Sequence, residues 1–308
     1  MSAQGGVLQA AGEAAAAIQT VSWVLIAGGT VIFAGVMFLL AWALRRRGGP
    51  VRPAVWVLGG GVLFPGVVLA ALFAWSLPLS PAWKPAPPAG ALVVGVTAHM
   101  WWWEVRYRDP STGAEVFTAN EIRIPTGRPV YLALASADVI HSFWIPQLAG
   151  KMDMLPGRIQ HLLLSASQPG VYRGQCAEFC GEQHALMAVH VVAQEPAAFD
   201  LWLAAQARPA ASPATPRQAA GRDAFLAQRC DACHSVRGVG ADSRLGPDLT
   251  HLGGRMHLAA GTLPNTAQAR EHWLAHVQMV KPGARMPSYD RLDTETLGAL
   301  AEWLGALQ

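Results

Sequence analysis

The chain has 308 residues, enough for two or three domains, and its composition differs from that of an ordinary soluble protein. Hydrophobic residues make up 52% and charged residues only 14%, so an apolar environment is expected for part of the chain. The net charge is only +3, and no segment has the clustered basic side chains that nucleic-acid binding requires, so a nucleic-acid partner is excluded.

Two long uncharged stretches open the chain, at residues 14–44 and 53–83. Each exceeds the ~20 apolar residues that are needed to cross the hydrocarbon core of a bilayer. A buried core helix or a cleavable signal peptide would be the alternative, but two such runs in tandem, with no basic residue before the first, favour a transmembrane hairpin. We expect this hairpin to cover residues 1–89, with helices at about 18–44 and 54–79.

The connection between the two stretches is basic. It contains Arg45, Arg46, Arg47 and Arg52, whereas Glu13 is the only charged residue before the first stretch. Basic connections stay on the cytoplasmic side of a membrane. Both chain termini and the remainder of the chain are therefore expected outside the cytoplasm.

The pattern changes after a proline-rich connector at 78–88, which cannot continue a helix. In residues 90–204, short segments rich in Val, Ile, Tyr and Trp alternate with Gly and Pro, which predicts an antiparallel β-sandwich or barrel. A Pro/Ala-rich linker at 205–217 is expected to be extended. Residues 218–308 have helical periodicity and predict a small α-helical domain.

All four cysteines of the chain fall into two close pairs, 176/180 and 230/233. Outside the cytoplasm the simplest interpretation would be two disulfides. The residues around each pair favour cofactor ligands instead.

The first pair lies in a segment rich in soft metal ligands, which includes Cys176, Cys180, His184 and Met187. Two thiolates, an imidazole and a thioether within this segment form a donor set that selects copper. One histidine cannot complete two metal positions, so a second is expected from elsewhere, and His141 leads into a loop of the β-domain. The alternative is that Met187 packs in the core and that the acid within the segment, Glu178, is solvated.

The second pair reads Cys230-Asp-Ala-Cys233-His234, the C-x-x-C-H pattern of c-type haem attachment. Two thiols on one turn can form thioethers with the haem vinyl groups, and the adjacent His234 can then ligate the iron. A zinc site would need a second pair of ligands nearby, and a redox dithiol would not need the histidine.

The other axial ligand of such a haem is usually Met or His. Met286 lies in a rigid loop, Lys281-Pro-Gly-Ala-Arg-Met-Pro287, that can present a thioether with little loss of entropy, and we choose it. The alternatives are Met256, Met279, His251, His257, His272 and His276. Met286 could instead fill a gap in the core.

These motifs together resemble cytochrome c oxidase subunit II with a fused class I cytochrome c domain, over nearly the whole chain. Residues 176–187 match that family's copper motif C-x-E-x-C-x-x-x-H-x-x-M, and 138–144 and 151–158 look like its other patterns. Residues 246–249 are similar to the stretch of cytochrome c that packs near the haem. The implied fold is a transmembrane hairpin, a cupredoxin-like β-sandwich or barrel, and an all-α cytochrome c domain.

The resemblance also implies a set of copper ligands. Cys176 and Cys180 would bridge the two copper ions of a CuA centre. His141 and Met187 would complete one copper, and His184 with the backbone carbonyl of Glu178 would complete the other. The Glu178 carboxylate would reach a magnesium ion at the interface with the catalytic subunit I.

Three tryptophans, Trp101, Trp102 and Trp103, follow one another just before this part of the family pattern. On a strand, Trp101 and Trp103 would share one face and Trp102 would occupy the other. Ordinary aromatic packing could explain them. In the family, however, an aromatic cluster at this position admits electrons to copper, and Trp101 matches its first position.

The implied function is electron transfer in a respiratory haem–copper terminal oxidase of the bacterial cell membrane. Electrons would pass from a quinol-oxidising complex or a soluble cytochrome to haem c, then to CuA, and then to subunit I, which reduces oxygen to water. No residue of this chain is expected to be catalytic. The alternatives are the electron-accepting subunit of a CuA-containing nitric oxide reductase and a copper chaperone or sensor.

Overall fold

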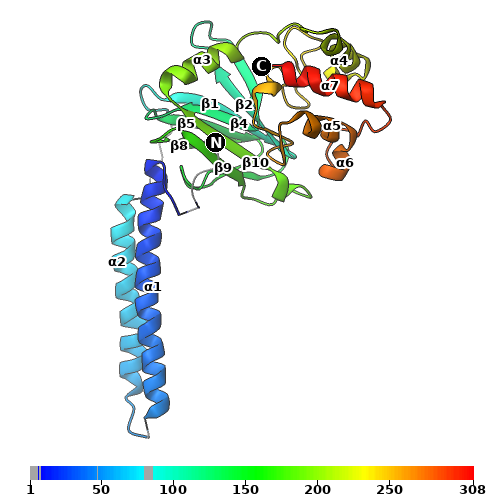
Figure 1. Cartoon of the computed structure of the whole chain (residues 1–308). Helices are drawn as coiled ribbons and strands as arrows, with labels where there is room; N and C mark the ends of the chain where they lie inside the picture. Colours follow the sequence, from blue (N-terminus) through cyan, green and yellow to red (C-terminus); the bar gives the residue numbers. More distant parts are fainter. Residues whose placement is uncertain (1–5, 7, 47, 80–85) are drawn as a thin grey trace.

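The computed structural model describes residues 6, 8–46, 48–79 and 86–308. Two long helices carry a β-sandwich, and a small helical domain lies against the side of the sandwich (Figure 1). This arrangement confirms the predicted order of two apolar helices, a β-sandwich and a C-terminal helical domain. Arg47 of the basic connection and residues 80–85 of the proline-rich connector lie outside the described residues.

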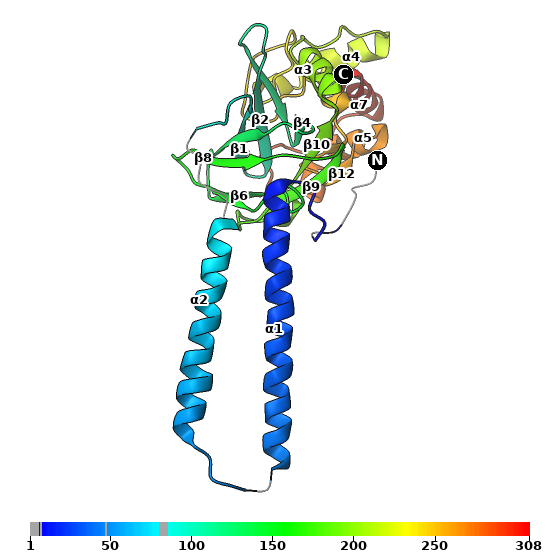
Figure 2. The same cartoon turned by 90° about the vertical axis from the view of Figure 1, so that its left-hand side faces the viewer.

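The two helices are long and apolar enough to cross a membrane. The first is α1 (Glu13–Arg45), and the second span, Val55–Leu79, joins the π-helix η1 (Val55–Leu63), α2 (Phe64–Ser76) and the 3-10 turn η2 (Leu77–Leu79). They stand side by side and project from the same side of the folded part (Figures 1 and 2). None of the residues in their most apolar windows is buried by protein, as expected for surfaces that face lipid.

The start of α1 is attached to the sandwich. The Ala11 amide donates to the Gln147 carbonyl (2.8 Å), and the Ser167 amide donates to the Ala11 carbonyl (2.9 Å). A Cβ atom at Gly12 would lie 2.3 Å from the Ser165 carbonyl oxygen, so only glycine fits there. Because of this anchoring, and because the alanines that follow favour helix, α1 begins at Glu13 rather than near residue 18.

The sandwich consists of two five-stranded sheets. The first has the order β3-β2-β1-β5-β8, with β1 (Leu92–His99), β2 (Trp102–Arg108), β3 (Glu115–Ala119), β5 (Val130–Ser136) and β8 (Gln160–Leu164). The second has the order β4-β10-β9-β6-β7, with β4 (Glu121–Pro125), β6 (His141–Trp144), β7 (Met152–Met154), β9 (Gly170–Cys176) and β10 (Ala188–Gln194).

The sandwich is not wholly antiparallel, so that expectation was wrong in part. Strand β1 pairs with β5 in parallel, and β10 pairs with β4 in parallel. In both cases the chain contributes a strand to the other sheet between the two partners. A crossover connection of this kind lets the second partner run in the same direction as the first. Alternation along a single strand carries no information about these long-range pairings.

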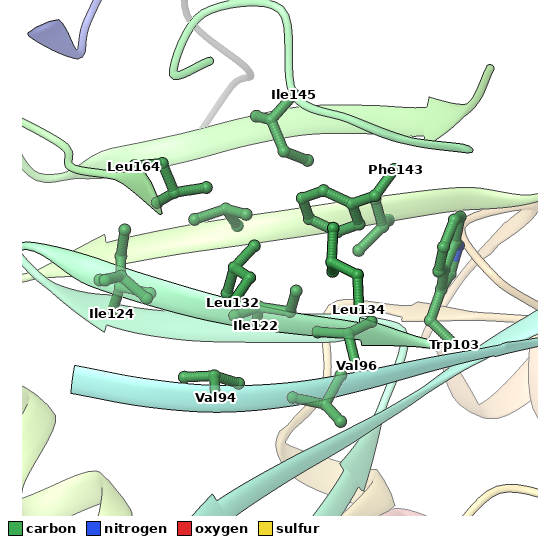
Figure 3. Close-up of a cluster of buried hydrophobic side chains, with 14 of the residues drawn as sticks. Val94, Val96, Trp103, Ile122, Ile124, Leu132, Leu134, Phe143, Ile145 and Leu164 are labelled. Atoms are coloured by element: carbon green, nitrogen blue, oxygen red, sulfur yellow. The ribbon is translucent and has the colours of Figure 1, made fainter. Parts of the chain in front are cut away.

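The core lies between the two sheets. Alternate side chains of β1 point inward, so Val94 and Val96 are buried, and they pair in register with Leu132 and Leu134 of β5. Figure 3 shows the side chains of this sheet facing Phe143 of β6 and Ile145, which follows β6. This packed layer fixes the ends of β6 and β9, from which the candidate metal ligands project.

Beyond β10 the chain becomes helical. Its elements are α3 (Pro196–Gln206), α4 (Pro216–Ala227), η4 (Cys230–Ala232), η5 (Leu252–Gly254), α5 (Ala267–Ala275), α6 (Val277–Val280) and α7 (Thr294–Ala306). A hairpin of β11 (His257–Leu258) and β12 (Leu263–Pro264) interrupts the helices. The Thr215 hydroxyl caps α4 by accepting from the Gln218 amide (3.1 Å), and the Asp293 carboxylate caps α7 by accepting from the Thr296 amide (2.8 Å).

The linker between α3 and α4 forms no helix or strand, but it is not free. The Ala210 amide donates to the Arg237 carbonyl (2.9 Å), and the His251 ring donates from Nε2 to the Arg208 carbonyl (3.1 Å). The segment expected to be an extended tether is therefore bound to the helical domain.

Helices α4 and α7 cross in close contact at Gly221. The rings of Phe225 and Trp303 lie beside the crossing with centroids 5.1 Å apart. A Cβ atom at position 221 would stand 2.1 Å from the Ala299 carbonyl oxygen and 2.8 Å from the Trp303 Cβ atom. The crossing thus depends on a missing side chain.

We therefore expect Gly221→Ala to lower the unfolding temperature of the helical domain. Separating the helices should cost about 1–3 kcal/mol, which exceeds the ~1 kcal/mol that alanine gains in helix propensity. Calorimetry of the full chain would measure the shift. Gly254→Ala is the matched control, because nothing lies within 4 Å of a Cβ atom there. Equal unfolding temperatures for the two variants would contradict the close crossing.

Candidate functional site

The predicted copper ligands gather at one end of the second sheet. His141 begins β6, Cys176 ends β9, and Cys180 lies in the loop that follows. His184 begins the short helix η3 (His184–Leu186), and Met187 follows it. Strands β6 and β9 are hydrogen-bonded neighbours, and Phe143 pairs with Cys176. Residues 35 positions apart are therefore brought together by strand pairing.

The side chains converge on the two cysteine sulfurs, which lie 3.8 Å apart. The Cys176 sulfur is 3.8 Å from His141 Nδ1 and 3.2 Å from the carbonyl oxygen of residue 178. The Cys180 sulfur is 3.6 Å from His184 Nδ1 and 3.9 Å from Met187 Sδ. All six predicted donors therefore surround one point.

This cluster is distinctive within the molecule. In the part of the chain that the structure describes, His141, Cys176 and Cys180 are the one group of three His, Cys, Asp or Glu side chains with ligand atoms all within 4.8 Å of one another. All three are buried. Neither cysteine forms a disulfide. A buried set of soft donors without a disulfide is what a thiolate-bound metal requires.

The two thiols shift each other's pKa in opposite directions. The hydrogen bond between them lowers the pKa of Cys176 far below its usual value, although burial opposes this shift. The same hydrogen bond, together with burial, raises the pKa of Cys180. The thiolate is the form of cysteine that binds metals, and the lowered pKa of Cys176 favours it.

Asp138 orients His141. One of its carboxylate oxygens, Oδ1, lies 2.8 Å from His141 Nε2, and Oδ2 accepts from the Met100 amide at 2.8 Å. Burial opposes ionisation of this carboxyl group, but its hydrogen bonds to His141, Met100 and Val139 lower its pKa. With Nε2 held by the carboxylate, Nδ1 is left to face the sulfur cluster, an arrangement typical of metal-binding histidines.

The backbone carbonyl and the side chain of Glu178 face different surroundings. Its backbone carbonyl faces the Cys176 sulfur, whereas its side chain is 44% exposed, with Oε2 3.9 Å from Lys151 Nζ. The carboxylate thus lies at the protein surface beside the cluster, where a neighbouring subunit could reach it.

The three tryptophans are not arranged as the sequence suggested. Strand β1 ends at His99 and β2 begins at Trp102, so Trp101 lies in the hairpin turn, and its sharing a strand face with Trp103 was wrong. Trp103 is fully buried against Phe143, with rings perpendicular and centroids 5.7 Å apart. Trp101 instead reaches the cysteine loop, where its Nε1 donates to the Cys180 carbonyl (2.9 Å).

The second candidate site is an apolar cavity of about 320 Å³ in the helical domain. It is lined by Cys230, Cys233, His234 and Met286, so the predicted haem-binding residues share one cavity. It is also lined by His99, Met100, Trp101, Trp102 and Asp138, which belong to the sandwich. Both domains therefore form its walls.

His234 is oriented for iron binding. Its Nδ1 donates to the Pro247 carbonyl (2.8 Å), which leaves Nε2 with a free lone pair. Burial lowers the pKa of His234 and keeps the ring neutral. A Cβ atom at Gly246 would lie 2.7 Å from the imidazole, so glycine is needed for this close approach.

The cavity also discriminates among the candidates for the other axial ligand. Met286 lines it, and of the six alternatives named above only His257 does so as well. The His257 ring is stacked on His190 of the sandwich at 4.3 Å. Met279 is 76% exposed. The geometry therefore favours Met286, whose loop is fixed by a hydrogen bond from Gln278 Nε2 to its carbonyl (2.7 Å).

The charges around the cavity are mostly positive. Five cationic side chains line it, whereas Asp138 is the one acid in its lining; the cations are Arg229, Arg255, Arg270, Lys281 and Arg285. The remaining walls are largely apolar and include Phe225, Leu249 and Leu274. An apolar body that carries carboxylates, such as haem, fits this lining.

Comparisons with known proteins find matches for the two folded domains. Residues 111–194 match the family model for the periplasmic domain of cytochrome c oxidase subunit II, and residues 218–308 match that for cytochrome c. The cytochrome c oxidase subunit 2 of Alkalihalophilus pseudofirmus is 37% identical over 227 residues, which cover 73% of this chain and 64% of the relative. That of Bacillus sp. (strain PS3) is 33% identical over 227 residues, with 70% and 62% covered.

A solved structure of the periplasmic domain of subunit II of the cytochrome oxidase of Bradyrhizobium japonicum is 28% identical, covers 39% of this chain and 95% of its own, and has a TM-score of 0.36. The matched part of the chain spans slightly less than two thirds of the length of the curated relatives.

The matched sandwich follows two membrane-crossing helices, so the chain is a membrane protein with an extracytoplasmic domain.

Sequence reasoning missed three residues at these sites. The role of Asp138 could have been suspected, because a carboxylate three residues before a ligating histidine can reach its ring. His99, which stacks on Trp102 at 4.3 Å, and Lys281, which is buried between the domains, had no comparable signal.

We expect Asp138→Asn to weaken metal binding about 10–100-fold, because a neutral amide orients and polarises His141 less well than a carboxylate. Copper titration in competition with a chelator would measure the change. Glu115→Gln serves as the control, because Glu115 is an exposed carboxylate on β3 that pairs with Arg106. An unchanged affinity in Asp138→Asn would mean that the carboxylate does not support the metal site.

Proposed function

We propose that this chain carries electrons within a haem–copper terminal oxidase, because its two folded domains match the family models for cytochrome c oxidase subunit II and cytochrome c. Haem c would receive them, CuA would pass them on, and a catalytic subunit I would reduce oxygen to water. One observation carries the proposal. Trp101 lines the haem cavity and also donates a hydrogen bond to the carbonyl of Cys180, so the two candidate redox sites share a side chain.

The copper site would use the donors around the two cysteines. Cys176 and Cys180 would bridge two copper ions, His141 and Met187 would complete one, and His184 with the Glu178 carbonyl would complete the other. The fit rests on the donor set itself, which is soft, buried and free of disulfides. Copper bound there supplies a one-electron centre. The protein's own part is to hold the sulfurs together, exclude water and fix the His141 ring through Asp138.

The haem site would use both cysteines of the second pair for thioethers. Cys230 is half-buried and Cys233 is exposed at the cavity, as attachment chemistry requires. His234 Nε2 and the Met286 thioether would take the two axial positions. The arginines around the cavity would hold the haem carboxylates, and burial by both domains would keep water away and help to set the potential.

The membrane arrangement follows from charge. We propose that both spans cross the bacterial cell membrane, with Arg45, Arg46 and Arg52 on the cytoplasmic side and both termini outside. The exposed Glu178 carboxylate would meet subunit I, with a magnesium ion between them. A quinol-oxidising complex or a soluble cytochrome would supply electrons to the haem.

Two other functions remain as outcomes of the tests. A nitric oxide reductase could use the same two sites, and identification of the large subunit that co-purifies would distinguish it. A copper chaperone or sensor needs a labile, accessible copper, whereas His141 and Met187 are fully buried here, and it has no need of the haem cavity. No structural observation favours either one over the oxidase subunit.

We expect Cys180→Ser to abolish the near-infrared absorption of binuclear copper, because a hydroxyl is a poor bridge between soft metals. The haem in the same variant should still be reduced by an external donor, which is the internal control. In stopped-flow measurements with the intact oxidase, its reoxidation should be blocked. Normal reoxidation without the copper signal would overturn the proposed order of haem before copper.

We expect Met286→Ala to leave the haem covalently attached but to open the sixth position of the iron. The iron should become high-spin or bind added ligands, and its potential should fall, because a thioether ligand raises it. Optical spectroscopy and redox titration would measure both changes. Met279→Ala is the matched control, since this methionine is exposed. An unchanged spectrum in Met286→Ala would move the assignment to His257.

A further inference from the structure

The helical domain is docked on the sandwich through hydrogen bonds that cross the seam between them. The Ala188 amide of β10 donates to the Ala260 carbonyl (2.9 Å), and the Met256 amide donates to the Glu121 carboxylate (3.0 Å). Gln183 Nε2 donates to the Pro282 carbonyl (2.7 Å). Bonds of this kind form only when the two domains are in contact, so they report docking directly.

Charged side chains are buried in this seam, among them Glu121 and Lys281. Lys281, in the loop after α6, is only 3% exposed. Its Nζ atom donates to the carbonyls of Trp101 (2.8 Å) and Leu186 (3.0 Å) in the sandwich and of Ala259 (3.2 Å) in the helical domain. The three donors of the ammonium group are therefore all used, and two of them cross the seam.

The partners of Lys281 are unusual for a buried cation. Among the ion pairs of the described residues none involves Lys281, so three neutral carbonyl dipoles replace water around it. Burial lowers the pKa of its ammonium group to about 7. If the domains separated, two of the three hydrogen bonds would be lost. This side chain is therefore satisfied in the docked state and not in a partly opened one.

The loop that holds Lys281 also connects the two candidate redox sites. Lys281 Nζ donates a hydrogen bond to the Trp101 carbonyl, and the Trp101 indole donates one to the Cys180 carbonyl. Five residues further on, the same loop places Met286 in the haem cavity. A displacement of Lys281 would thus move the haem cavity relative to the cysteine cluster.

We propose that Lys281 is a positioning residue, a buried latch that fixes the haem domain to the copper domain at Trp101. The fused cytochrome is then a docked domain and not a mobile carrier on a flexible tether. Because the latch bonds to neutral carbonyls in a buried seam, docking is insensitive to salt, unlike docking through surface charges. The electron-transfer consequence rests on the proposed function, whereas the docking itself does not.

The first test is hydrogen exchange on the full chain with Lys281→Met, which keeps the length of the side chain but removes its three donors. Losing hydrogen bonds from a charged donor should raise seam opening about tenfold or more. Exchange of the Ala188 and Met256 amides should accelerate by that factor, while that of the Val94 and Leu132 amides in the sandwich core should not. Arg222→Gln, an exposed residue of α4 paired with Asp223, is the control and should change nothing.

The second test measures transfer from haem to copper after flash reduction of the haem. Lys281→Met should slow it, because the Trp101 backbone is no longer held in place, while the haem and copper spectra stay unchanged. The two rates are compared after correction for any change in the haem potential, because Lys281 also lines the haem cavity. Absence of either spectrum in the wild-type protein would refute the proposed function, not the latch. The latch would be overturned if the variant showed both spectra but neither its transfer rate nor the exchange of its Ala188 amide differed from the wild type.

A measurement on the wild-type protein decides the matter if the variant does not fold. Exchange of the Ala188 amide should be the same at low salt and at about 1 M salt, where the Debye length falls to about 3 Å. Faster exchange at high salt would show that exposed charges hold the domains together. That result would overturn the latch.

Discussion

Two thiol sulfurs are held 3.8 Å apart in the interior of a β-sandwich, and most other features of the chain serve this arrangement. Bringing them together places two polarisable, hydrogen-bonded thiols in a poorly solvated place, and this arrangement persists only if the surrounding groups are fixed. The register of β6 on β9 sets His141 beside Cys176, and the short helix η3 returns His184 and Met187 to the same point. The rigid layer of Val, Leu and Phe side chains beneath these strands keeps the donors from relaxing apart.

The second consequence concerns how the two domains meet. A cavity that is lined by residues of both domains cannot keep its shape if they move independently. The hairpin turn at Trp101, the stacked pair His190 and His257, and the buried ammonium of Lys281 all lie along this seam. The linker is itself hydrogen-bonded to the helical domain. A covalent fusion therefore acts here by fixing one geometry, and not only by raising the local concentration of the cytochrome.

The membrane helices complete this picture. Because Ala11 and Gly12 are hydrogen-bonded to or packed against the sandwich, α1 emerges directly from the copper domain without an intervening flexible segment. The domain is thus held close to the membrane, with the Glu178 carboxylate exposed beside the sulfur cluster. A partner embedded in the same membrane would meet the cluster at a fixed height, which suits electron transfer to a catalytic subunit.

The sequence alone determined the features whose cause is local. Two uncharged stretches predicted the spans, and the spacings of Cys176 to Met187 and of Cys230 to His234 predicted which donors lie together, because neighbours in one loop or turn cannot separate far. Only the tertiary structure decided the parallel pairings of the sheets, the position of Trp101 in a turn, and the carboxylate of Asp138 on His141. It alone brought Lys281 against Trp101, 180 residues away, because such a contact follows from the docking of two domains and leaves no periodicity or spacing in the chain.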